Sequence, residues 1–261
     1  MRRIGLIGDG AMSRAVRGVL ARSLPDAEIC AILTRGAAGA DPDRRYVTAA
    51  PDLVARRPDI VLECAGHGAV AQLVPEILRA GICTIVMSVG AFADAALLAR
   101  VEDCAARGGA RLICATGAIG GLDALRSARL EGLTSVTYTG RKPPAAWAGT
   151  PAADKWDLSA LRADTVIFSG DARSAALGFP KNANVTAAVA LSGIGFEKTR
   201  VVLIAAPSLK RNVHEIAAAG AFGSLQMKLE NEALPDNPRT SALAALNAAY
   251  LIRRELRSIE S

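Results

Sequence analysis

Ile4-Gly5-Leu6-Ile7-Gly8-Asp9-Gly10-Ala11-Met12-Ser13 is the stretch of the sequence that decides the fold. Its apolar start predicts a short buried strand, and a helix is predicted from about Ala11 to about Arg22. Gly8 permits a tight turn between them, and Gly10 lets the backbone approach a pyrophosphate at the helix N-terminus. A strand, a glycine turn and a helix in this order are typical of a dinucleotide-binding fold. The sequence therefore predicts that Gly8, Gly10, Ala11 and Met12 contact a dinucleotide.

The third small residue of this motif is a serine where a glycine is usual. Ser13 weakens the motif, although a small side chain still lets helix and strand pack closely. The alternative is a strand and turn of a parallel sheet that binds no nucleotide. The position of the motif, directly before a repeated strand–helix pattern, favours the nucleotide.

The residues that follow, as far as Ala115, alternate between strands and helices with short connections. Strands are expected at 28–33, 46–48, 59–64, 83–88 and 111–115, and helices at 51–57, 70–80 and 94–107. This alternation predicts an α/β fold, a Rossmann-type doubly wound parallel sheet with helices on both faces. Ligands bind such sheets at the carboxyl ends of the strands. The candidates there, besides the glycine turn, are Arg35, Ala65, Gly66 and His67.

Two of these residues leave alternatives open. No acidic residue ends the second strand, where one commonly holds the ribose hydroxyls, and Arg35 stands there instead. A guanidinium at this point suits the 2′-phosphate of NADP, or it is an ordinary solvent-facing arginine. His67 either borders the nicotinamide or ribose with its side chain or, as is commoner, lies in a loop that contributes backbone atoms only.

Beyond Ala115 the sequence becomes strand-rich. Strands are expected at 133–141, 165–169, 200–206, 212–219 and 224–229, and helices at 123–129, from Pro180 and at 240–255. We expect an antiparallel sheet in a second α+β domain, residues 116–239. The last helix is expected to pack back on the first domain, so the dinucleotide-binding domain comprises residues 1–115 and 240–261.

Composition excludes several classes of protein. The 261 residues carry a net charge of +6, but the basic residues are scattered, which argues against a nucleic-acid partner. Apolar runs are much shorter than the roughly 20 residues that span a membrane, and the glycine turn interrupts the apolar start too early for a signal peptide. Five cysteines without Cys-x-x-Cys spacing and two histidines predict reduced thiols, no metal site and a cytoplasmic location.

Few residues of the second half are candidates for chemistry. His214 lies on a predicted strand, and an imidazole titrates near neutrality, which suits proton transfer; a structural histidine paired within the sheet is the alternative. Asn184, like Asn182, lies at a predicted helix start, where it either caps the helix or hydrogen-bonds a cofactor. Lys181 and Arg211 are candidate partners for a carboxylate or ordinary exposed cations.

The long loop before the strand at 165–169 contains both tryptophans. Residues 145–156 either pack under the loop through these rings or form an active-site lid that hinges near Gly149.

Six further stretches form a specific combination, in order along almost the whole chain. They are Glu63-Cys64-Ala65-Gly66-His67, Gly117-Ala118-Ile119-Gly120-Gly121-Leu122-Asp123-Ala124-Leu125, Lys142-Pro143-Pro144-Ala145-Ala146-Trp147, Phe179-Pro180-Lys181-Asn182-Ala183-Asn184-Val185, Asn212-Val213-His214-Glu215-Ile216 and Asn237-Pro238-Arg239-Thr240-Ser241. In this combination the chain resembles the L-aspartate dehydrogenase family. The later stretches are more specific than the glycine turn, whereas Ser13 and Arg35 leave the preferred cofactor open.

The resemblance implies oxidation of L-aspartate to iminoaspartate with NAD or NADP, reversible as reductive amination of oxaloacetate, and a supply route to NAD biosynthesis. It implies that Ala118 and Asn184 contact the cofactor and that His214 is the active-site residue. It also implies a homodimer, with residues 116–239 as a catalytic and dimerisation domain similar to that of homoserine dehydrogenases. Because an ammonium group does not readily release a hydride from the α-carbon, His214 is expected to take the amine proton directly or through water.

Two other functions compete with this one. A related NAD(P)-dependent reductase would use the same two-domain plan on another small amino acid or imine. A non-catalytic sensor would bind NAD(P)H without turnover, and replacing His214 would leave its output unchanged.

Overall fold

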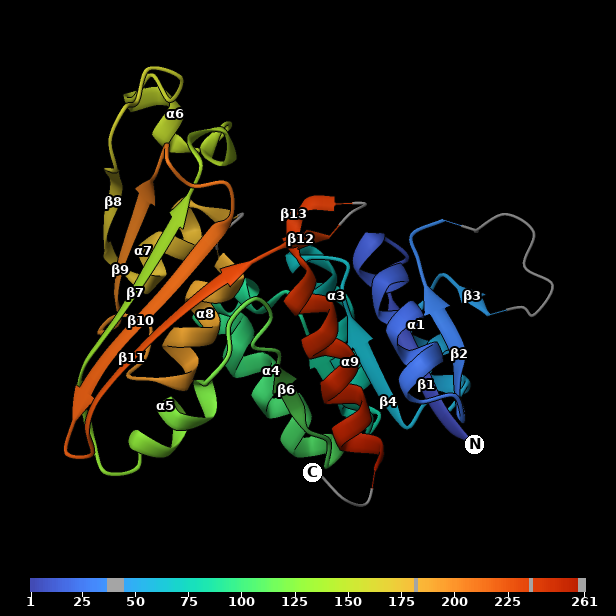
Figure 1. The fold of residues 1–261 in the computed structure, drawn as a ribbon. Helices are drawn as coiled ribbons and strands as arrows, with labels where there is room; N and C mark the ends of the chain where they lie inside the picture. Colours follow the sequence, from blue (N-terminus) through green and yellow to red (C-terminus); the bar gives the residue numbers. More distant parts are fainter. Residues whose placement is uncertain (37–44, 181–182, 235–236, 258–261) are drawn as a thin grey trace. The chain divides into compact units, whose positions relative to one another are not determined.

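The fold is given by a computed structural model that describes residues 1–36, 45–180, 183–234 and 237–257. The chain divides into two compact units (Figure 1). The first unit combines residues 1–115 with the chain from Ala244 onward, and the second unit comprises Thr116–Leu243.

The first unit is built on a six-stranded sheet in the order β3-β2-β1-β4-β5-β6. Its strands are β1 (Arg2–Ile7), β2 (Ala27–Leu33), β3 (Tyr46–Val47), β4 (Ile60–Glu63), β5 (Cys83–Val86) and β6 (Leu112–Cys114). Their pairings are parallel, which confirms the predicted doubly wound sheet. The strand order reverses between β1 and β4, and ligands of such sheets bind outside the carboxyl ends at this switch point.

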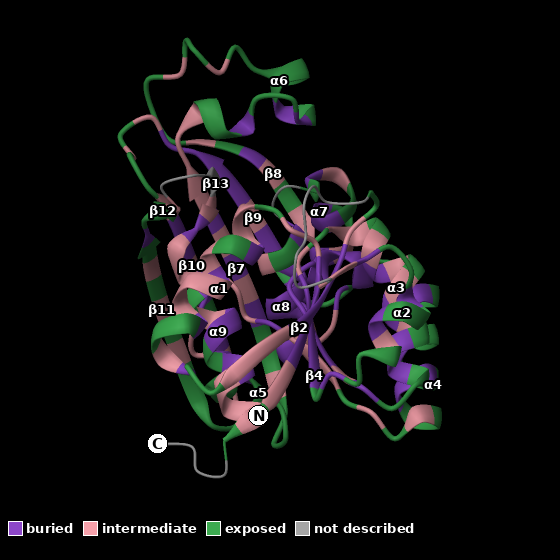
Figure 2. Cartoon of the chain, turned by 90° about the vertical axis from the view of Figure 1, so that its right-hand side faces the viewer, coloured by how far each residue is buried: buried purple, intermediate pink, exposed green. Residues whose placement is uncertain are grey.

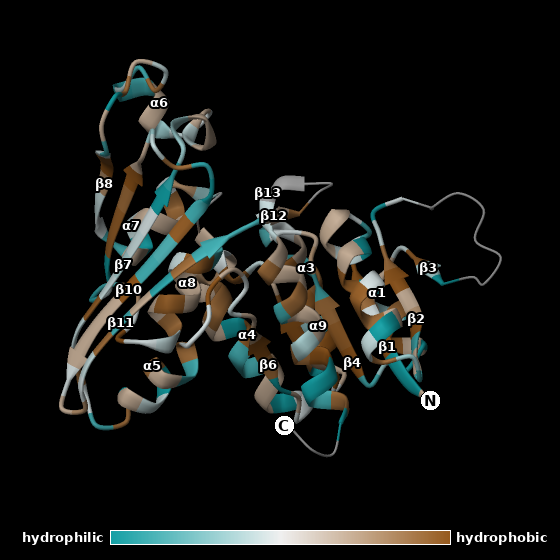
Figure 3. Cartoon of the chain, viewed as in Figure 1, coloured by the Kyte–Doolittle hydropathy of each residue, from teal (hydrophilic) through white to brown (hydrophobic). Residues whose placement is uncertain are grey.

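Helices cover both faces of this sheet (Figure 2). One face carries α1 (Ala11–Ser23) and α9 (Ala242–Leu256), and the other carries α2 (Ala50–Ala55), α3 (His67–Arg79) and α4 (Ala95–Gly108), which follows the short 3₁₀ helix η1 (Val89–Ala93). Glu255 of α9 forms an ion pair with Arg111, beside β6. Because both faces are covered, the strands are apolar along most of their length, as the brown colour in Figure 3 shows.

Helix α3 begins earlier than the sequence predicts. The expected start was Val70, but the helix starts at His67. Gly66, at φ +115°, turns the chain directly after the β4 strand, in a backbone region that favours glycine. His67 is therefore the first residue of a helix, and the loop between strand and helix is short.

The second unit contains a five-stranded sheet in the order β11-β10-β7-β9-β8. Its strands are β7 (Leu133–Lys142), β8 (Thr165–Asp171), β9 (Arg200–Ala205), β10 (Asn212–Gly220) and β11 (Gly223–Asn231); a small hairpin, β12 (Ala233–Leu234) and β13 (Asn237–Ser241), follows. The expected antiparallel pairing is found for β10–β11, β10–β7 and β8–β9. It is wrong for β7 and β9, which are parallel, because the long connection between them returns the chain to the starting end of β7.

Helices α5 (Leu122–Ala128) and α8 (Ala183–Ser192) of the second unit lie on the face of the sheet that bears Val136, and we call this the inner face. The other helical segments of this unit are η2 (Pro144–Trp147), α6 (Pro151–Lys155) and α7 (Ala172–Gly178). Space around Gly193, directly after α8, is bounded by Val136 and Leu125.

The expected helix start at Pro180 adjoins residues outside the described part. Helix α7 was not predicted, although its cap Asp171, which accepts a hydrogen bond from the Ser174 amide at 2.7 Å, is a recognisable start signal.

Candidate functional site

The glycine turn of the first unit joins β1 to α1 and lies against the loop after β4. Gly8 has φ +100°, and a Cβ atom there would lie 3.0 Å from the Cβ of Ala65. Its amide donates to the Leu33 carbonyl of β2 at 2.8 Å. A side chain at this position would therefore force apart the ends of the central strands, which explains the glycine without reference to a ligand.

Gly10 has a different environment. Its backbone is extended, at φ −79° and ψ −173°, and a Cβ atom there would meet nothing within 4 Å. Gly66 has the same open space. These two residues are the N-caps of α1 and α3, and neither helix has a side-chain cap. Open space beside two helix N-termini, at the ends of the adjacent strands β1 and β4, fits the pyrophosphate of a dinucleotide.

Glu63 organises the loop on which this site depends, and the sequence assigned it no role. The carboxylate is buried at the end of β4 and accepts hydrogen bonds from the amides of Ala65, Gly66 and Ser88 at 2.7, 2.8 and 3.0 Å. The Ser88 hydroxyl donates a fourth at 2.9 Å. Burial raises the pKa of Glu63, against the effect of these bonds. Glu63 thus fixes the positions of the predicted cofactor residues Ala65 and Gly66, with His67 next in the chain.

An acidic residue does occur near the end of β2, but the glycine turn supplies it. Asp9 pairs with Arg17 of α1 and accepts a hydrogen bond from the hydroxyl of Tyr46, on β3, at 2.8 Å. This bond is the main reason that the pKa of Tyr46 is raised. Arg35 follows β2 and is exposed. Asp9 was not predicted in this place, because an acidic residue is expected there only from the end of the second strand.

The side chain that replaces the third glycine is accommodated within the helix–sheet packing. Ser13 is fully buried on α1, together with Val16 and Leu20. The nearby Cys64 donates to the Ile7 carbonyl at 3.4 Å, and burial raises the pKa of its thiol to about 12. A protonated, packed thiol at this position serves the structure of the loop.

The inner face of the second sheet is apolar at one end and polar at the other. Strand register places Tyr138, Gly140 and Lys142 of β7 on the same face as His214 of β10. The polar residues gather where β7 ends and β10 begins, whereas the opposite end carries buried residues such as Val136. We call the region of Lys142 and His214 the polar end.

His214 is buried at the polar end, with only 4% of its surface exposed. Its Nδ1 lies 2.8 Å from the hydroxyl of Tyr138, and the two rings stack with their centroids 6.0 Å apart. Burial, and to a smaller extent the positive charge of Lys142, lower the pKa of His214 to about 4. The imidazole is therefore neutral at neutral pH.

Lys142 is the cation that acts on His214, and no role for it was predicted from the sequence. It is half-buried at the end of β7, with its Nζ 5.5 Å from the ring centroid of Trp147. Trp147 is fully buried against Phe179, with the ring centroids 6.1 Å apart, as expected of a packing residue, whereas Trp156 is 41% exposed. A signal for Lys142 was available, because it begins one of the stretches that carry the family resemblance.

Ala118 approaches the polar end through its backbone. Its carbonyl accepts a hydrogen bond from the side chain of Asn231 at 2.7 Å. Asn231 pairs with Asn212, two residues before His214 on β10. The structure thus brings the predicted residues Ala118 and His214 to the same end of the sheet.

The other residues expected in the second unit have different outcomes. Asn184 is exposed in the first turn of α8. Lys181 and Asn182 lie outside the described residues. Arg211 forms an exposed ion pair with Glu232 at 2.5 Å, so its charge is already matched.

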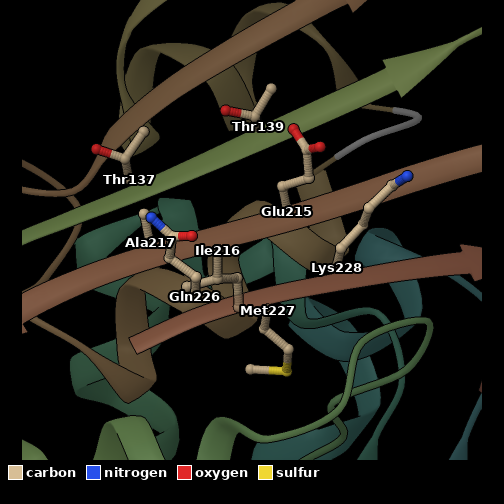
Figure 4. Close-up of a pocket in the computed structure, with 8 residues that line it drawn as sticks. All are labelled: Thr137, Thr139, Glu215, Ile216, Ala217, Gln226, Met227 and Lys228. Atoms are coloured by element: carbon tan, nitrogen blue, oxygen red, sulfur yellow. The ribbon is translucent and has the colours of Figure 1, made fainter. Parts of the chain in front are cut away.

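The outer face of the second sheet carries a hollow of about 390 Å³ (Figure 4). Thr137, Thr139, Glu215 and Lys228 line it from three neighbouring strands. Because successive side chains of a strand point to opposite faces, Glu215 points away from the face that bears His214. The hollow is therefore separate from the polar end.

Three observations concern the remaining sequence predictions. Across the described ranges, no helix is long and apolar enough to cross a membrane. The described residues also contain no cluster of three or more histidine, cysteine or acidic side chains that could hold a metal ion. The five cysteines are free.

Two family models match the chain and together cover most of it. Residues 4–115 match the NAD-binding domain of homoserine dehydrogenase. Residues 123–255 match the C-terminal domain of aspartate dehydrogenase.

Individual relatives agree with these models. An L-aspartate dehydrogenase of Ralstonia nicotianae is 44% identical over 256 residues, which is 95% of either chain. One from Ruegeria pomeroyi is 49% identical over 76% of this chain and 72% of the relative. The crystal structure of aspartate dehydrogenase from Thermotoga maritima superposes with a TM-score of 0.80 at 26% identity, covering 100% of this chain and 99% of that one.

Proposed function

This chain belongs to the L-aspartate dehydrogenase family, and from that premise we propose that it oxidises L-aspartate to iminoaspartate with NAD or NADP. The observation that carries the proposal is the polar end of the second sheet, where Lys142 and a neutral His214 lie on a face whose opposite end is apolar. A small dianionic substrate needs cationic and hydrogen-bonding partners in such a place.

The cofactor would be held by the ends of the strands in the first unit. Gly10 and Gly66 leave open space for its phosphates beside the N-termini of α1 and α3, where Ala11, Met12 and His67 would line it. Gly8 and Ala65 would shape the turn and the loop around it, because the amides of Gly8, Ala65 and Gly66 already donate within the unit. Arg35 would favour a 2′-phosphate, whereas Asp9 disfavours additional negative charge nearby. When bound, NAD or NADP supplies the acceptor for one hydride, which carries both electrons of the oxidation. Ala118 and Asn184 are the proposed contacts from the second unit.

The polar end would bind and orient the substrate. Lys142 would hold one carboxylate by charge. His214 is neutral, so two roles are open to its second ring nitrogen, Nε2. It can accept the proton that the substrate amine must lose before the carbon–nitrogen double bond forms, or it can donate a hydrogen bond to the substrate.

The wider features implied by the family are proposals as well. We propose a homodimer, with residues 116–239 as the catalytic and dimerisation domain and residues 1–115 with 240–261 as the dinucleotide-binding domain. We also propose a cytoplasmic enzyme whose product enters NAD biosynthesis. Light scattering of the purified protein tests the dimer directly, because a monomeric mass would contradict it.

An absorbance assay of the purified protein tests the reaction. Reduced nicotinamide is followed in the near ultraviolet with L-aspartate and either NAD or NADP, which also reveals the preferred cofactor. Homoserine, alanine and glutamate serve as alternative substrates, and faster turnover of one of them would assign the chain to a different amino acid. Binding of NAD(P)H without turnover of any substrate would support a sensor instead.

A further inference from the structure

Tyr138 and His214 form a closely defined pair on the inner face of the second sheet. The tyrosine hydroxyl lies 2.8 Å from Nδ1 of the imidazole, and the rings are inclined by 17°. Tyr138 is only 1% exposed, so solvent does not compete for this bond. The two residues lie on adjacent strands, β7 and β10, and the register of the sheet fixes their separation.

Gly140 creates the space for this bond. It lies directly opposite His214 in the β7–β10 pairing. A Cβ atom at Gly140 would lie 2.8 Å from the hydroxyl oxygen of Tyr138 and 3.3 Å from its Cζ atom. Glycine inside a strand usually weakens it and often marks a close approach by another group. Here the approaching group is the phenol.

The direction of the hydrogen bond follows from the burial of Tyr138. Burial raises the pKa of the phenol, so its proton is retained. In the part of the chain that the structure describes, Nδ1 of His214 is the hydrogen-bond partner of this hydroxyl. A buried O–H group without an acceptor is costly, so the hydroxyl donates and Nδ1 accepts. A neutral imidazole whose Nδ1 accepts a hydrogen bond carries its own proton on Nε2.

We propose that Tyr138, in the space left by Gly140, holds the proton of His214 on Nε2, so that His214 donates a hydrogen bond to a carboxylate of the substrate and does not take the proton of its amine. This inference rests on the proposed function. Lys142 and an Nε2–H group at the polar end are both donors, which suits a dicarboxylate. Aspartate would then react from the fraction whose amine is already neutral. Tyr138 and Gly140 are positioning residues, and His214 is the group that touches the substrate.

Nitrogen NMR of the full chain, labelled with ¹⁵N at histidine, tests the positioning directly. The two histidines are distinguished because the signals of His214 disappear in a His214→Gln variant. We expect Nδ1 of His214 to be unprotonated and Nε2 protonated, and we expect Tyr138→Phe to yield a mixture of both forms. A proton on Nδ1 in the unsubstituted protein, or no change in the Tyr138→Phe variant, would overturn the proposal.

Gly140→Ala provides a second variant with its own internal control. The added methyl group should displace the hydroxyl and change the state of His214 in the same way as Tyr138→Phe. It should also lower the melting temperature less in the Tyr138→Phe background, where the 2.8 Å contact with the hydroxyl no longer exists. Equal losses in both backgrounds would show that Gly140 does not make room for the hydroxyl.

Kinetics separate a donor from a base. A glutamine amide can replace an Nε2–H donor but cannot accept the proton, so His214→Gln should retain turnover within roughly tenfold of the unsubstituted enzyme, with the same dependence of kcat/KM on pH. Tyr138 and Lys142 are the titratable groups found to act on His214 in the described residues, and both remain in this variant. Loss of an inflection in the pH profile, with turnover as low as in His214→Ala, would identify a base and overturn the donor role.

The two measurements fail independently. The protonation of His214 is measured without substrate, so it stands whether or not the protein oxidises aspartate. A protein that shows the expected Nε2–H form but no aspartate-dependent turnover refutes the proposed function, and with it the donor role. Turnover with a proton on Nδ1 refutes the positioning by Tyr138 and leaves the proposed function intact.

Discussion

Each unit of the molecule buries a titratable side chain near the end of a strand, Glu63 in the first and His214 in the second, and the two differ in how far their hydrogen-bonding capacity is used. Glu63, 0% exposed, accepts four hydrogen bonds within its own unit. His214, 4% exposed, is bonded through Nδ1, and the described residues supply no hydrogen-bond partner for its Nε2. Burial is therefore a poor guide to function in this chain. A buried group whose polar atoms are all hydrogen-bonded serves the structure, whereas one with a polar atom left unbonded can act on a ligand.

The same contrast appears in the direction of the pKa shifts. Burial favours the neutral form of each group, so the pKa of Glu63 is raised and that of His214 is lowered. The hydrogen bonds to Glu63 oppose the shift because they stabilise the carboxylate. Nothing comparable in the described residues stabilises an imidazolium at His214, where Lys142 acts in the same direction as burial.

The largest effect on stability is expected when the carboxylate of Glu63, which accepts four hydrogen bonds, is removed. Glu63→Ala should lower the free energy of unfolding by about 3–5 kcal/mol, because three amides and a hydroxyl lose a buried acceptor. Urea unfolding measures the loss. Glu102, exposed on α4 of the same unit, provides the matched control, and its replacement by alanine should cost less than about 0.5 kcal/mol. Similar losses for both variants would contradict the structural role of Glu63.

Removal of the imidazole of His214 should lower the rate of aspartate oxidation. His214→Ala should reduce kcat roughly 100- to 1,000-fold, because the substrate loses a group that stabilises its reacting form. Binding of the cofactor, measured by fluorescence of the reduced nicotinamide, should remain unchanged. Near-normal turnover with unchanged cofactor binding would remove His214 from the reaction.

The dependence of stability on pH should reveal the same residue. An unfolded chain protonates this imidazole near the ordinary pKa of 6.5, whereas the folded protein resists protonation until about pH 4. The unfolded state therefore binds more protons between these values, and stability is lost as the pH falls through them, by about 2–3 kcal/mol from this group alone. Glu63, with its raised pKa, contributes in the opposite direction.

Comparison of two proteins isolates this contribution. Unfolding of the unsubstituted protein and of the His214→Gln variant is measured from pH 6.5 to about pH 4. The variant should lose less stability over this range, since Glu63, Tyr138 and Lys142 are common to both. Parallel curves would mean that His214 is accessible to protons in the folded state.

Sequence reasoning predicted the first sheet well because its signal is local. Apolar strands alternate with amphipathic helices over short connections, so each element can be recognised from its own residues. The second sheet was less predictable, since its one parallel pair, β7 and β9, depends on how a long connection returns the chain. Strand order is a property of the whole unit and has no signature in either strand.

In the candidate site too, residues with a local sequence signal were predicted, whereas residues whose roles depend on tertiary contacts were not. The glycine turn and His214 were found from residue type and position. Glu63, Tyr138 and Lys142 were not, because their roles depend on which atoms they face across neighbouring strands. Gly140 was equally hidden, since its meaning lies in the phenol that would meet its Cβ.

The smallest effect is expected from substitutions in the glycine turn of the first unit. There the closely packed Gly8 and the open Gly10 lie two residues apart. Gly10→Ala should leave the free energy of unfolding almost unchanged, because the added Cβ meets nothing within 4 Å and the backbone is extended. It should weaken NAD(P) binding about tenfold, or about 1.4 kcal/mol, if that space is where the pyrophosphate approaches. Gly8→Ala is the matched control, since its strained φ of +100° and its 3.0 Å contact with Ala65 predict a loss of stability first. Calorimetry of cofactor binding together with thermal unfolding distinguishes the two variants. Unchanged affinity in Gly10→Ala would show that the open space beside α1 does not receive the phosphates, and would move the cofactor away from the turn that decides the fold.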